Sequence, residues 1–392
     1  METSHLIERL SNRFPNATWP AVFLDYMAEQ EQCGHQLRRA DSGELLYPFL
    51  RRQYAPRNHV RLFLKTESRI QIKVDFGQLL QLAPDEIFSY LIDHYSPIFD
   101  LQQVALDSEL PTGFNRHGQK HVRLVTANSV GLIKQRNPLS IFDSYEKEAI
   151  IGGMFHDIGN IIGRQYHGLY GIYLLTQLFE GYSVDEETLK SFLVVLEVVM
   201  LHEVEFGTWS AQLADLNAAT LSTIIADKTD VGFHRISAKS NVAGAVDDAH
   251  VIINLLVSDS KLERVRDASG GFLWTVDFRP RFDADQHALF SQLLKATGRV
   301  LYPREWKDIY EEENIEYLFL FQSVFLEIYL TRMFFAMRSV FTLFPSVEEF
   351  SLIINDPERG LSLRRTFPRQ SYAQQVAVLG KLFLREAWPD SR

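Results

Sequence analysis

Apolar residues recur at helical spacing throughout the middle of this 392-residue chain. Between residues 120 and 230 they fall every three or four positions, which places them on one face of each segment. Short connecting stretches separate these segments. The pattern predicts five helices: His121–Lys134, Tyr145–His156, Gly168–Phe179, Glu186–His202 and Gln212–Lys228.

The residues before this helical region predict a mixed α and β unit. Apolar and polar residues alternate well enough for two strands, Leu62–Leu64 and Ile70–Phe76, which would form a hairpin. Pro84 then opens a helix that extends to Tyr95, because proline suits the first turn of a helix. The glycine- and proline-containing stretch Asp107–Gly118 is expected to be the loop that ends this unit.

The pattern changes again after the five helices. Val251–Val257 and Phe272–Phe278 are expected to be strands, with a turn at Asp267–Gly271 between them. The remainder is expected to be helical as far as a basic, proline-marked tail that starts at Pro357. Within it, phenylalanines stand at helical spacing in Tyr317–Phe344, which favours a buried helix or a contact between subunits.

These patterns predict a mainly α chain whose helical core is flanked by small β-containing units. The expected boundaries are 1–110 for an N-terminal α+β unit, 111–246 for the helical core, and 247–392 for a C-terminal unit with a β-hairpin and helices. The phenylalanine-rich helix of the last unit is the place where a homodimer contact is expected.

The composition of the chain excludes several classes of protein and of binding partner. Hydrophobic residues make up 46% of the chain, so it can bury a large core. Asp and Glu total 50 against 40 for Lys and Arg, and this net charge of -10 argues against binding to duplex nucleic acid or an anionic membrane. Cys33 is the single cysteine, which excludes an internal disulfide and a cysteine-based zinc cluster. Without an apolar leader or an uncharged apolar run of about 18 residues, a cytoplasmic protein is expected.

The candidate chemistry is concentrated in the sequence Gly152-Gly153-Met154-Phe155-His156-Asp157-Ile158-Gly159-Asn160. A helix there delivers adjacent histidine and aspartate and then ends on glycine. Imidazole and carboxylate together suit manganese, iron, cobalt, nickel or zinc, whereas an all-oxygen shell favours magnesium or calcium. The pair alone is also compatible with two hydrogen-bonded residues at the surface.

Two further residues fit a metal site better than an ordinary core. His121 shares a helix face with apolar residues, so its imidazole needs a buried partner. Asp227 follows Leu221, Ile224 and Ile225 on a strongly apolar helix, where a carboxylate is costly unless a cation compensates it. One metal ion would satisfy both residues.

The order His121, His156-Asp157, Asp227 resembles the HD superfamily of metal-dependent phosphohydrolases. Neighbouring residues are similar as well: His-Val-Arg-Leu-Val at 121 to 125, Phe-His-Asp-Ile-Gly-Asn at 155 to 160, and Ile-Ala-Asp-Lys at 225 to 228. The resemblance covers about a third of the chain, residues 117 to 235. It departs at Asn160, where many members carry lysine.

The resemblance extends toward the branch with two metals. His167 and His202 stand where such members place further histidine ligands, while capping or solvent-facing histidines are the alternative. His117 stands one helical turn before His121, but Gly118 favours a loop there. His202-Glu203 replaces the paired histidines of cyclic-dinucleotide phosphodiesterases of the HD-GYP type, and the Gly-Tyr-Pro element is missing, which argues against that specificity.

The resemblance implies hydrolysis of a nucleotide-like phosphate ester by a metal-activated hydroxide. One or two divalent ions, manganese, iron, cobalt, nickel, zinc or magnesium, would be held by His121, His156, Asp157, His167, His202 and Asp227. Asp157 and Lys228 are the expected catalytic residues, and Lys228, His234 and Arg235 would bind phosphate unless they are solvated charges. Two alternatives remain: a di-iron oxygenase with the same six ligands, and a non-catalytic module that binds a nucleotide.

Overall fold

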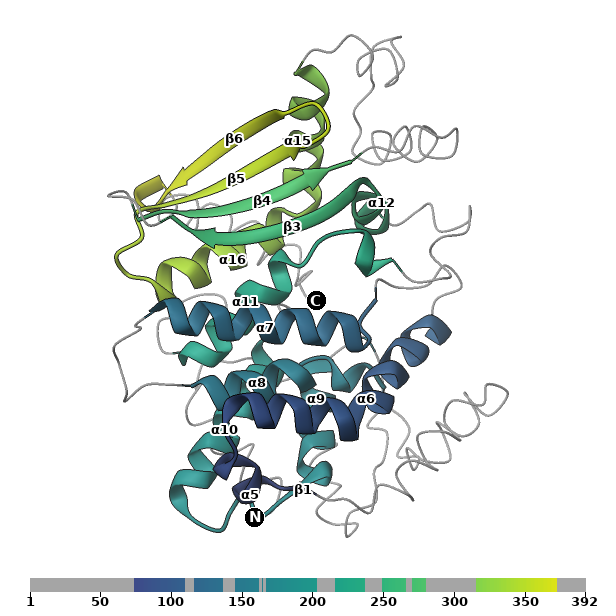
Figure 1. Ribbon diagram of the computed structural model, residues 1–392, viewed down its shortest axis with the longest axis vertical. Coiled ribbons are helices and arrows are strands. Elements are labelled where there is room, and N and C mark those ends of the chain that lie inside the picture. The colour runs from purple at the N-terminus through teal and green to yellow at the C-terminus, as the bar shows by residue number, and fades with distance from the viewer. Residues whose placement is uncertain are drawn as a thin grey trace, which may run out of the picture. The chain divides into compact units, whose positions relative to one another are not determined.

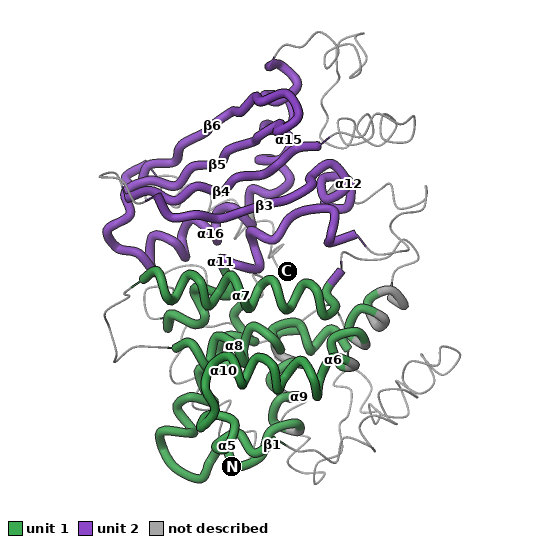
Figure 2. The backbone as a smooth tube through the Cα atoms, viewed as in Figure 1, with its two compact units in different colours: residues 1–109, 117–224 green, residues 110–116, 225–392 purple. Residues whose placement is uncertain are grey.

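The computed structural model describes the chain as two compact units (Figures 1 and 2). The described residues are 74–109, 116–136, 145–161, 164, 167–202, 216–236, 249–265, 270–279 and 315–371. Unit 1 comprises residues 1–109 and 117–224, and unit 2 comprises 110–116 and 225–392. The three-part division expected from the sequence stays a prediction.

Unit 1 is built from helices, which confirms the mainly α character of the chain. Its helices are α5 (Phe76–Gln81), α6 (Pro84–Glu109), α7 (Gln119–Arg136), α8 (Glu146–Phe155), the short 3-10 helix η1 (Ile158–Ile161), α9 (His167–Leu178), α10 (Glu186–Leu201) and the start of α11 (Ala218–Thr229). Two short strands, β1 (Val74–Asp75) and β2 (Phe179–Glu180), pair in parallel. Helices α7 to α11 correspond to the five that the sequence predicts.

Local capping explains where several of these helices begin. The Asp75 carboxylate accepts a hydrogen bond from the backbone N–H of Gln78 at the start of α5, and Asp185 does the same for Thr188 at the start of α10. Each satisfies an N–H that has no partner within the helix. Helix α11 starts at Ala218, because Asn217 caps it by accepting a hydrogen bond from the N–H of Thr220. The predicted start at Gln212 lies outside the described residues.

Helix α8 lies at the centre of unit 1 and packs against α6, α7 and α10. Its glycines allow this close packing. A Cβ added to Gly152 would lie 2.7 Å from Val198 on α10, and one added to Gly153 would lie 2.9 Å from the Thr126 hydroxyl on α7. The last turn of α8 is thus held in place from two sides, directly before His156.

Unit 2 contains a four-stranded sheet with the order β3-β4-β5-β6. The strands are β3 (Val257–Arg264), β4 (Phe272–Phe278), β5 (Glu349–Asp356) and β6 (Leu361–Pro368), and the remaining helices are α12 (Ala249–Leu256), α15 (Glu316–Ile328) and α16 (Leu330–Leu343). The β3-β4 and β5-β6 pairs are antiparallel, while β4 and β5 are parallel. A parallel pair needs a long connection, and α15 and α16 lie in the connection between β4 and β5.

The phenylalanine-rich segment forms α15 and α16 and packs its rings into the core of unit 2. Trp274 contacts Phe325, and Phe278 contacts Phe321, with ring centroids 5.4 and 4.2 Å apart. Phe319 is the large exposed side chain of this segment, at 52% exposure. The homodimer contact stays a prediction.

No single helix in the described ranges has the length and apolar content needed to cross a membrane. Helix α15 and the Arg332–Leu343 part of α16 meet those criteria only when they are taken together, across a bend of 80°.

Several expectations from the sequence were wrong in unit 2. Val251–Leu256 forms the end of α12 rather than a strand, because a short apolar run suits either a buried helix or a buried strand. Strand β3 starts only at Val257. The predicted strand Phe272–Phe278 is confirmed as β4, but it pairs with Val257–Arg264 rather than with the expected strand Val251–Val257. Residues 349–356 form β5 instead of helix, and Leu361–Pro368 forms the edge strand β6 instead of a tail.

Other corrections concern the N-terminal region. Helix α6 continues to Glu109, so the first three residues of the loop expected at Asp107–Gly118 are helical. Residues 110–115 of that loop lie outside the described residues. The predicted hairpin falls mostly on residues that are not described. Its last residue, Phe76, begins α5 instead of ending a strand, because Asp75 caps the helix at that point.

Candidate metal centre

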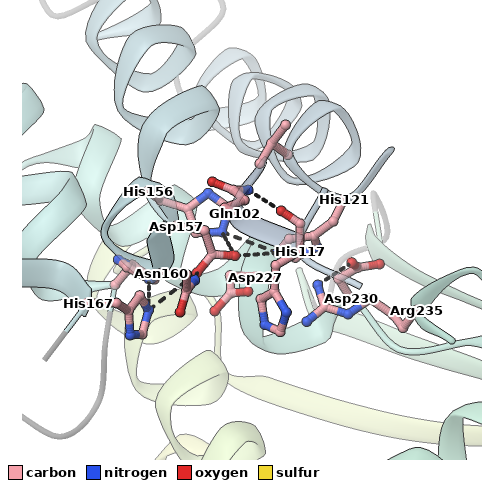
Figure 3. Close-up of polar contacts among 12 residues, drawn as sticks. Gln102, His117, His121, His156, Asp157, Asn160, His167, Asp227, Asp230 and Arg235 are labelled. Atoms are coloured by element: carbon pink, nitrogen blue, oxygen red, sulfur yellow. Dashed lines mark hydrogen bonds and ion pairs between the residues drawn. The ribbon is translucent and has the colours of Figure 1, made fainter. Parts of the chain in front are cut away.

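Five predicted ligands of unit 1 converge from the ends of four helices. Figure 3 labels four of them: His121, His156, Asp157 and His167. His121 lies in the first turn of α7, His156 and Asp157 directly follow α8, His167 begins α9, and His202 directly follows α10. All five side chains are buried, with at most 3% exposure. The sequence separates them by as many as 81 positions, so only the packing of the helices brings them together.

The Asp157 carboxylate lies between two pairs of imidazoles. Its Oδ2 is 3.3 Å from Nε2 of His121 and 3.1 Å from Nε2 of His156. Its Oδ1 is 3.3 Å from Nε2 of His167 and 3.6 Å from Nε2 of His202. Each carboxylate oxygen therefore faces its own pair of ring nitrogens, which is the arrangement of a carboxylate that bridges two sites.

Backbone carbonyls fix the orientation of three of these rings. Nδ1 of His156 donates to the Gly153 carbonyl at 2.7 Å, and Nδ1 of His202 donates to the Val199 carbonyl at 2.7 Å. Nδ1 of His167 donates in the same way to the Arg164 carbonyl at 2.9 Å. In a neutral ring the proton then lies on Nδ1, so Nε2 carries a lone pair.

The resulting lone pairs point at one another. Nε2 of His167 and Nε2 of His202 are 2.9 Å apart, and two neutral rings that are protonated on Nδ1 would have no proton to place between them. Burial lowers the pKa of His202 to about 4, so this ring is neutral near pH 7. Two facing lone pairs at this distance repel unless a cation lies near both, and a metal ion with imidazole ligands meets that need.

The negative charge of Asp157 also requires a nearby cation. Burial raises the pKa of this carboxyl, but the neighbouring His156, His117 and His121 lower it by more, and the net pKa lies well below its usual range. Asp157 is thus an ionised carboxylate. Its Oδ2 is buried and accepts no hydrogen bond from the residues that the structure describes. A buried charge of this kind is costly unless a cation compensates it.

Asp227 supplies a further carboxylate from α11. The division between the units falls inside this continuous helix, whose first seven residues belong to unit 1. An oxygen of Asp227 and one ring nitrogen each of His121 and His156 lie within 4.8 Å of one another, and so do ligand atoms of His156, Asp157 and His202. The donor set of buried imidazoles and carboxylates fits a divalent metal ion.

The three predicted phosphate-binding residues each contact an aspartate. Nζ of Lys228 donates to Oδ2 of Asp227 at 2.6 Å. His234 contacts one oxygen of Asp230 at 2.6 Å, and Arg235 donates to the other at 3.2 Å. Lys228 and Arg235 are buried, so neither is a solvated surface charge. Their role toward substrate stays a prediction.

His117 lies in the loop before α7, as Gly118 suggests, and its ring packs edge to face on His121. The Gln102 amide donates to its backbone carbonyl, and its own N–H donates to Gln103. His117 is therefore a buried neighbour of a ligand, held by its backbone.

Two residues near Asp157 were missed from the sequence. The Asn160 amide donates to Oδ1 of Asp157 at 3.0 Å, and the Arg164 guanidinium lies 3.3 Å from both ring nitrogens of His167. The spacing of Asn160, one turn after Asp157, was the signal that could have found it.

Comparison with known proteins does not add a function. No family model matches the chain, and no solved structure matches it significantly. The chain is 26% identical over 146 residues to the uncharacterized protein MJ1020 of Methanocaldococcus jannaschii. That alignment covers 33% of this chain and 56% of the relative, so the chain spans about half the length of the curated relative that it matches.

Proposed function

We propose that the chain is a divalent-metal-dependent phosphohydrolase or phosphodiesterase that acts on a nucleotide-like small molecule. The observation that carries this proposal is the position of Asp157, whose two oxygens each face a separate pair of imidazole nitrogens at 3.1 to 3.6 Å. A carboxylate shared in this way suits two ions held close together, an arrangement that phosphatases and nucleases use to stabilise both the attacking and the leaving oxygen.

The chain's own residues prepare the site for this chemistry. His121, His156 and Asp227 would hold one ion, His167 and His202 the other, with Asp157 between them. Bound divalent ions lower the pKa of water and offset negative charge on phosphoryl oxygens. The backbone carbonyls of Gly153, Val199 and Arg164 keep the rings oriented, and the helix ends around Asp157 keep its carboxylate away from bulk water.

Lys228 is proposed to act on Asp227 before it acts on substrate. Its ammonium group donates to Oδ2 of Asp227 at 2.6 Å and would orient this carboxylate as a ligand. Arg235 and His234 supply the positive and hydrogen-bonding groups that a phosphate requires, and Asp230 orients both of them. Arg235→Lys would keep the charge but lose the planar fork, so we expect a raised KM for phosphate esters with little change in bound metal.

The proposal is tested by loading the metal-stripped protein with manganese, iron, cobalt or zinc and screening hydrolysis of mono-, di-, tri- and cyclic nucleotides. Phosphate release reports the phosphohydrolase reaction, and chromatography of the nucleotide products reports the opening of a cyclic phosphodiester. We expect hydrolysis with at least one metal, and its loss in Asp157→Asn, which keeps the size of the side chain and removes its charge. Asp185→Asn is the matched control, because asparagine still caps α10 there.

Other outcomes would replace the proposal with a specific alternative. Oxygen consumption by the iron-loaded protein, without phosphate release from any nucleotide, would favour a di-iron oxygenase. Nucleotide binding without turnover across all four metals would favour a non-catalytic binding module. Phosphate release that persists in Asp157→Asn would exclude this site as its source.

A further inference from the structure

Helix α11 carries Asp227 but has little bulk with which to fix its own position. Every residue from 218 to 229 for which exposure is given is buried, and six of the first nine are alanine, serine or threonine: Ala218, Ala219, Thr220, Ser222, Thr223 and Ala226. Small side chains form only shallow ridges on a helix surface. Apolar packing by itself therefore does little to prevent the helix from sliding along its axis.

One polar contact joins α11 to α7. The Ser129 hydroxyl lies 2.7 Å from the Ser222 hydroxyl and 3.1 Å from that of Thr223. All three groups are completely buried. Ser129 stands on α7 about two turns after His121, so this contact relates α11 to a helix that bears a candidate ligand.

A second polar contact joins α11 to α10. Oε1 of Glu197 accepts hydrogen bonds from the Asn217 amide and, at 3.1 Å, from the Thr220 hydroxyl. Asn217 in turn caps α11 through the N–H of Thr220. Glu197 is 1% exposed and lies five residues before His202, near the end of α10.

The gain in stability does not by itself explain why α11 makes buried polar contacts with α7 and α10. A buried hydrogen bond contributes about 1 kcal/mol net, and well-packed apolar side chains often do as well as a buried polar group. Buried polar contacts instead distinguish one register from its neighbours, because a slipped helix leaves their donors and acceptors without partners.

A helix that carries a metal ligand must be positioned accurately along its axis. Sliding α11 by a single residue moves it by about 1.5 Å along its axis. Metal to ligand distances vary by only about 0.2 Å. A slip of one residue would therefore remove Asp227 from any ion held by His121 and His156.

We infer that the Ser129 and Glu197 contacts position α11 against α7 and α10 and thereby set the place of Asp227 in the metal centre. Ser129 and Glu197 are positioning residues, since they act through Asp227. This inference rests on the metal centre and not on the phosphohydrolase reaction, because its test uses metal binding and backbone exchange without substrate.

The test compares the manganese affinity of Ser129→Ala and Glu197→Leu with that of two controls. Thr126→Val removes a buried hydroxyl of α7 whose one hydrogen bond among the described residues is to the Val122 carbonyl of the same helix. Glu197→Gln keeps an acceptor oxygen for Asn217 and Thr220. We expect a loss of about tenfold or more in the first two variants and less than twofold in the controls.

Repeating the measurement in the Asp227→Asn variant distinguishes a positioning role of Ser129 from a general loss of stability in unit 1. In Asp227→Asn, Ser129→Ala should cause no further loss, because the ligand through which it acts is already altered. An equal loss in both backgrounds, or unchanged affinity in both Ser129→Ala and Glu197→Leu, would overturn the inference.

Hydrogen exchange gives a readout that needs no metal. We expect faster amide exchange at residues 225–227 in Ser129→Ala than in Thr126→Val. If Glu197→Leu does not fold, Ser222→Ala takes its place, since it removes the nearer of the two partners of Ser129 on α11. Equal exchange in Ser129→Ala, Ser222→Ala and Thr126→Val would also overturn the inference.

Discussion

Gly159 stands where a single methyl group should disable one half of the metal centre. A Cβ built on Gly159 would lie 1.7 Å from the backbone carbonyl oxygen of His167 and 2.7 Å from the N–H nitrogen of Gly171. Both obstacles are backbone atoms, so no side chain can rotate to make room. Ordinary contact begins near 3.4 Å, so η1 and the start of α9 would have to separate by about 1.7 Å.

That displacement is several times larger than a metal site tolerates, since metal to ligand distances vary by about 0.2 Å. We expect Gly159→Ala to lose about one equivalent of bound metal, with His167 displaced, and to lower the free energy of unfolding by about 1 to 3 kcal/mol through overpacking. Metal content after manganese loading and chemical denaturation measure the two effects.

Gly131 provides the matched control. It lies on the same unit in α7, and a Cβ there would meet no atom within 4 Å. Alanine is about 0.5 to 1 kcal/mol more favourable than glycine within a helix, so Gly131→Ala should stabilise the protein and leave metal content unchanged. If Gly159→Ala kept the metal content and stability of the parent protein, the inference that η1 and α9 have no room for a methyl group would be refuted.

Four further outcomes follow from the centre. Asp157→Ala should abolish metal binding and turnover but keep the helical content, and full activity would contradict its role. His167→Ala and His202→Ala should each remove about one metal equivalent; unchanged stoichiometry in both would indicate a single ion. Chelation should lower the melting temperature, and less so in Asp227→Asn; indifference to chelator in the parent would remove Asp227 from the centre. Without metal, stability should fall as the pH drops from 6.5 to about 4, because burial lowers the pKa of His202 and the unfolded chain then binds more protons. His202→Gln should flatten this dependence, and an identical slope would refute the assignment.

The helices of unit 1 could be predicted because their signals are local. Apolar periodicity located α7 to α10 within one or two residues, and Pro84 marked the start of α6. The short run Val251–Leu256 carried no such period, so its helix could not be told from a strand. Strand β5 was missed because it depends on hydrogen bonds to β4 and β6 on either side. A local sequence pattern does not report such pairing between segments.

The candidate ligands could be named from the sequence, but their arrangement could not. A carboxylate in an apolar helix and a histidine on a buried face are anomalies that a sequence displays, as at Asp227 and His121. The sharing of Asp157 between two pairs of rings depends on where four helix ends meet. Arg164 contacts His167 from the segment after the helix end, where spacing along the chain is a poor guide, whereas Asn160 stands one turn after Asp157.

His156 and His202 are the residues at which α8 and α10 end, and each ring donates to a carbonyl three residues earlier. The contact that closes the helix is the same one that aims the ligand. Termination of these helices during folding therefore also prepares the centre, so the protein can mature in two separable stages in which folding precedes loading. Ions would then compete for ligands that are already oriented, and cellular supply together with the general affinity order of divalent metals would decide which ion binds.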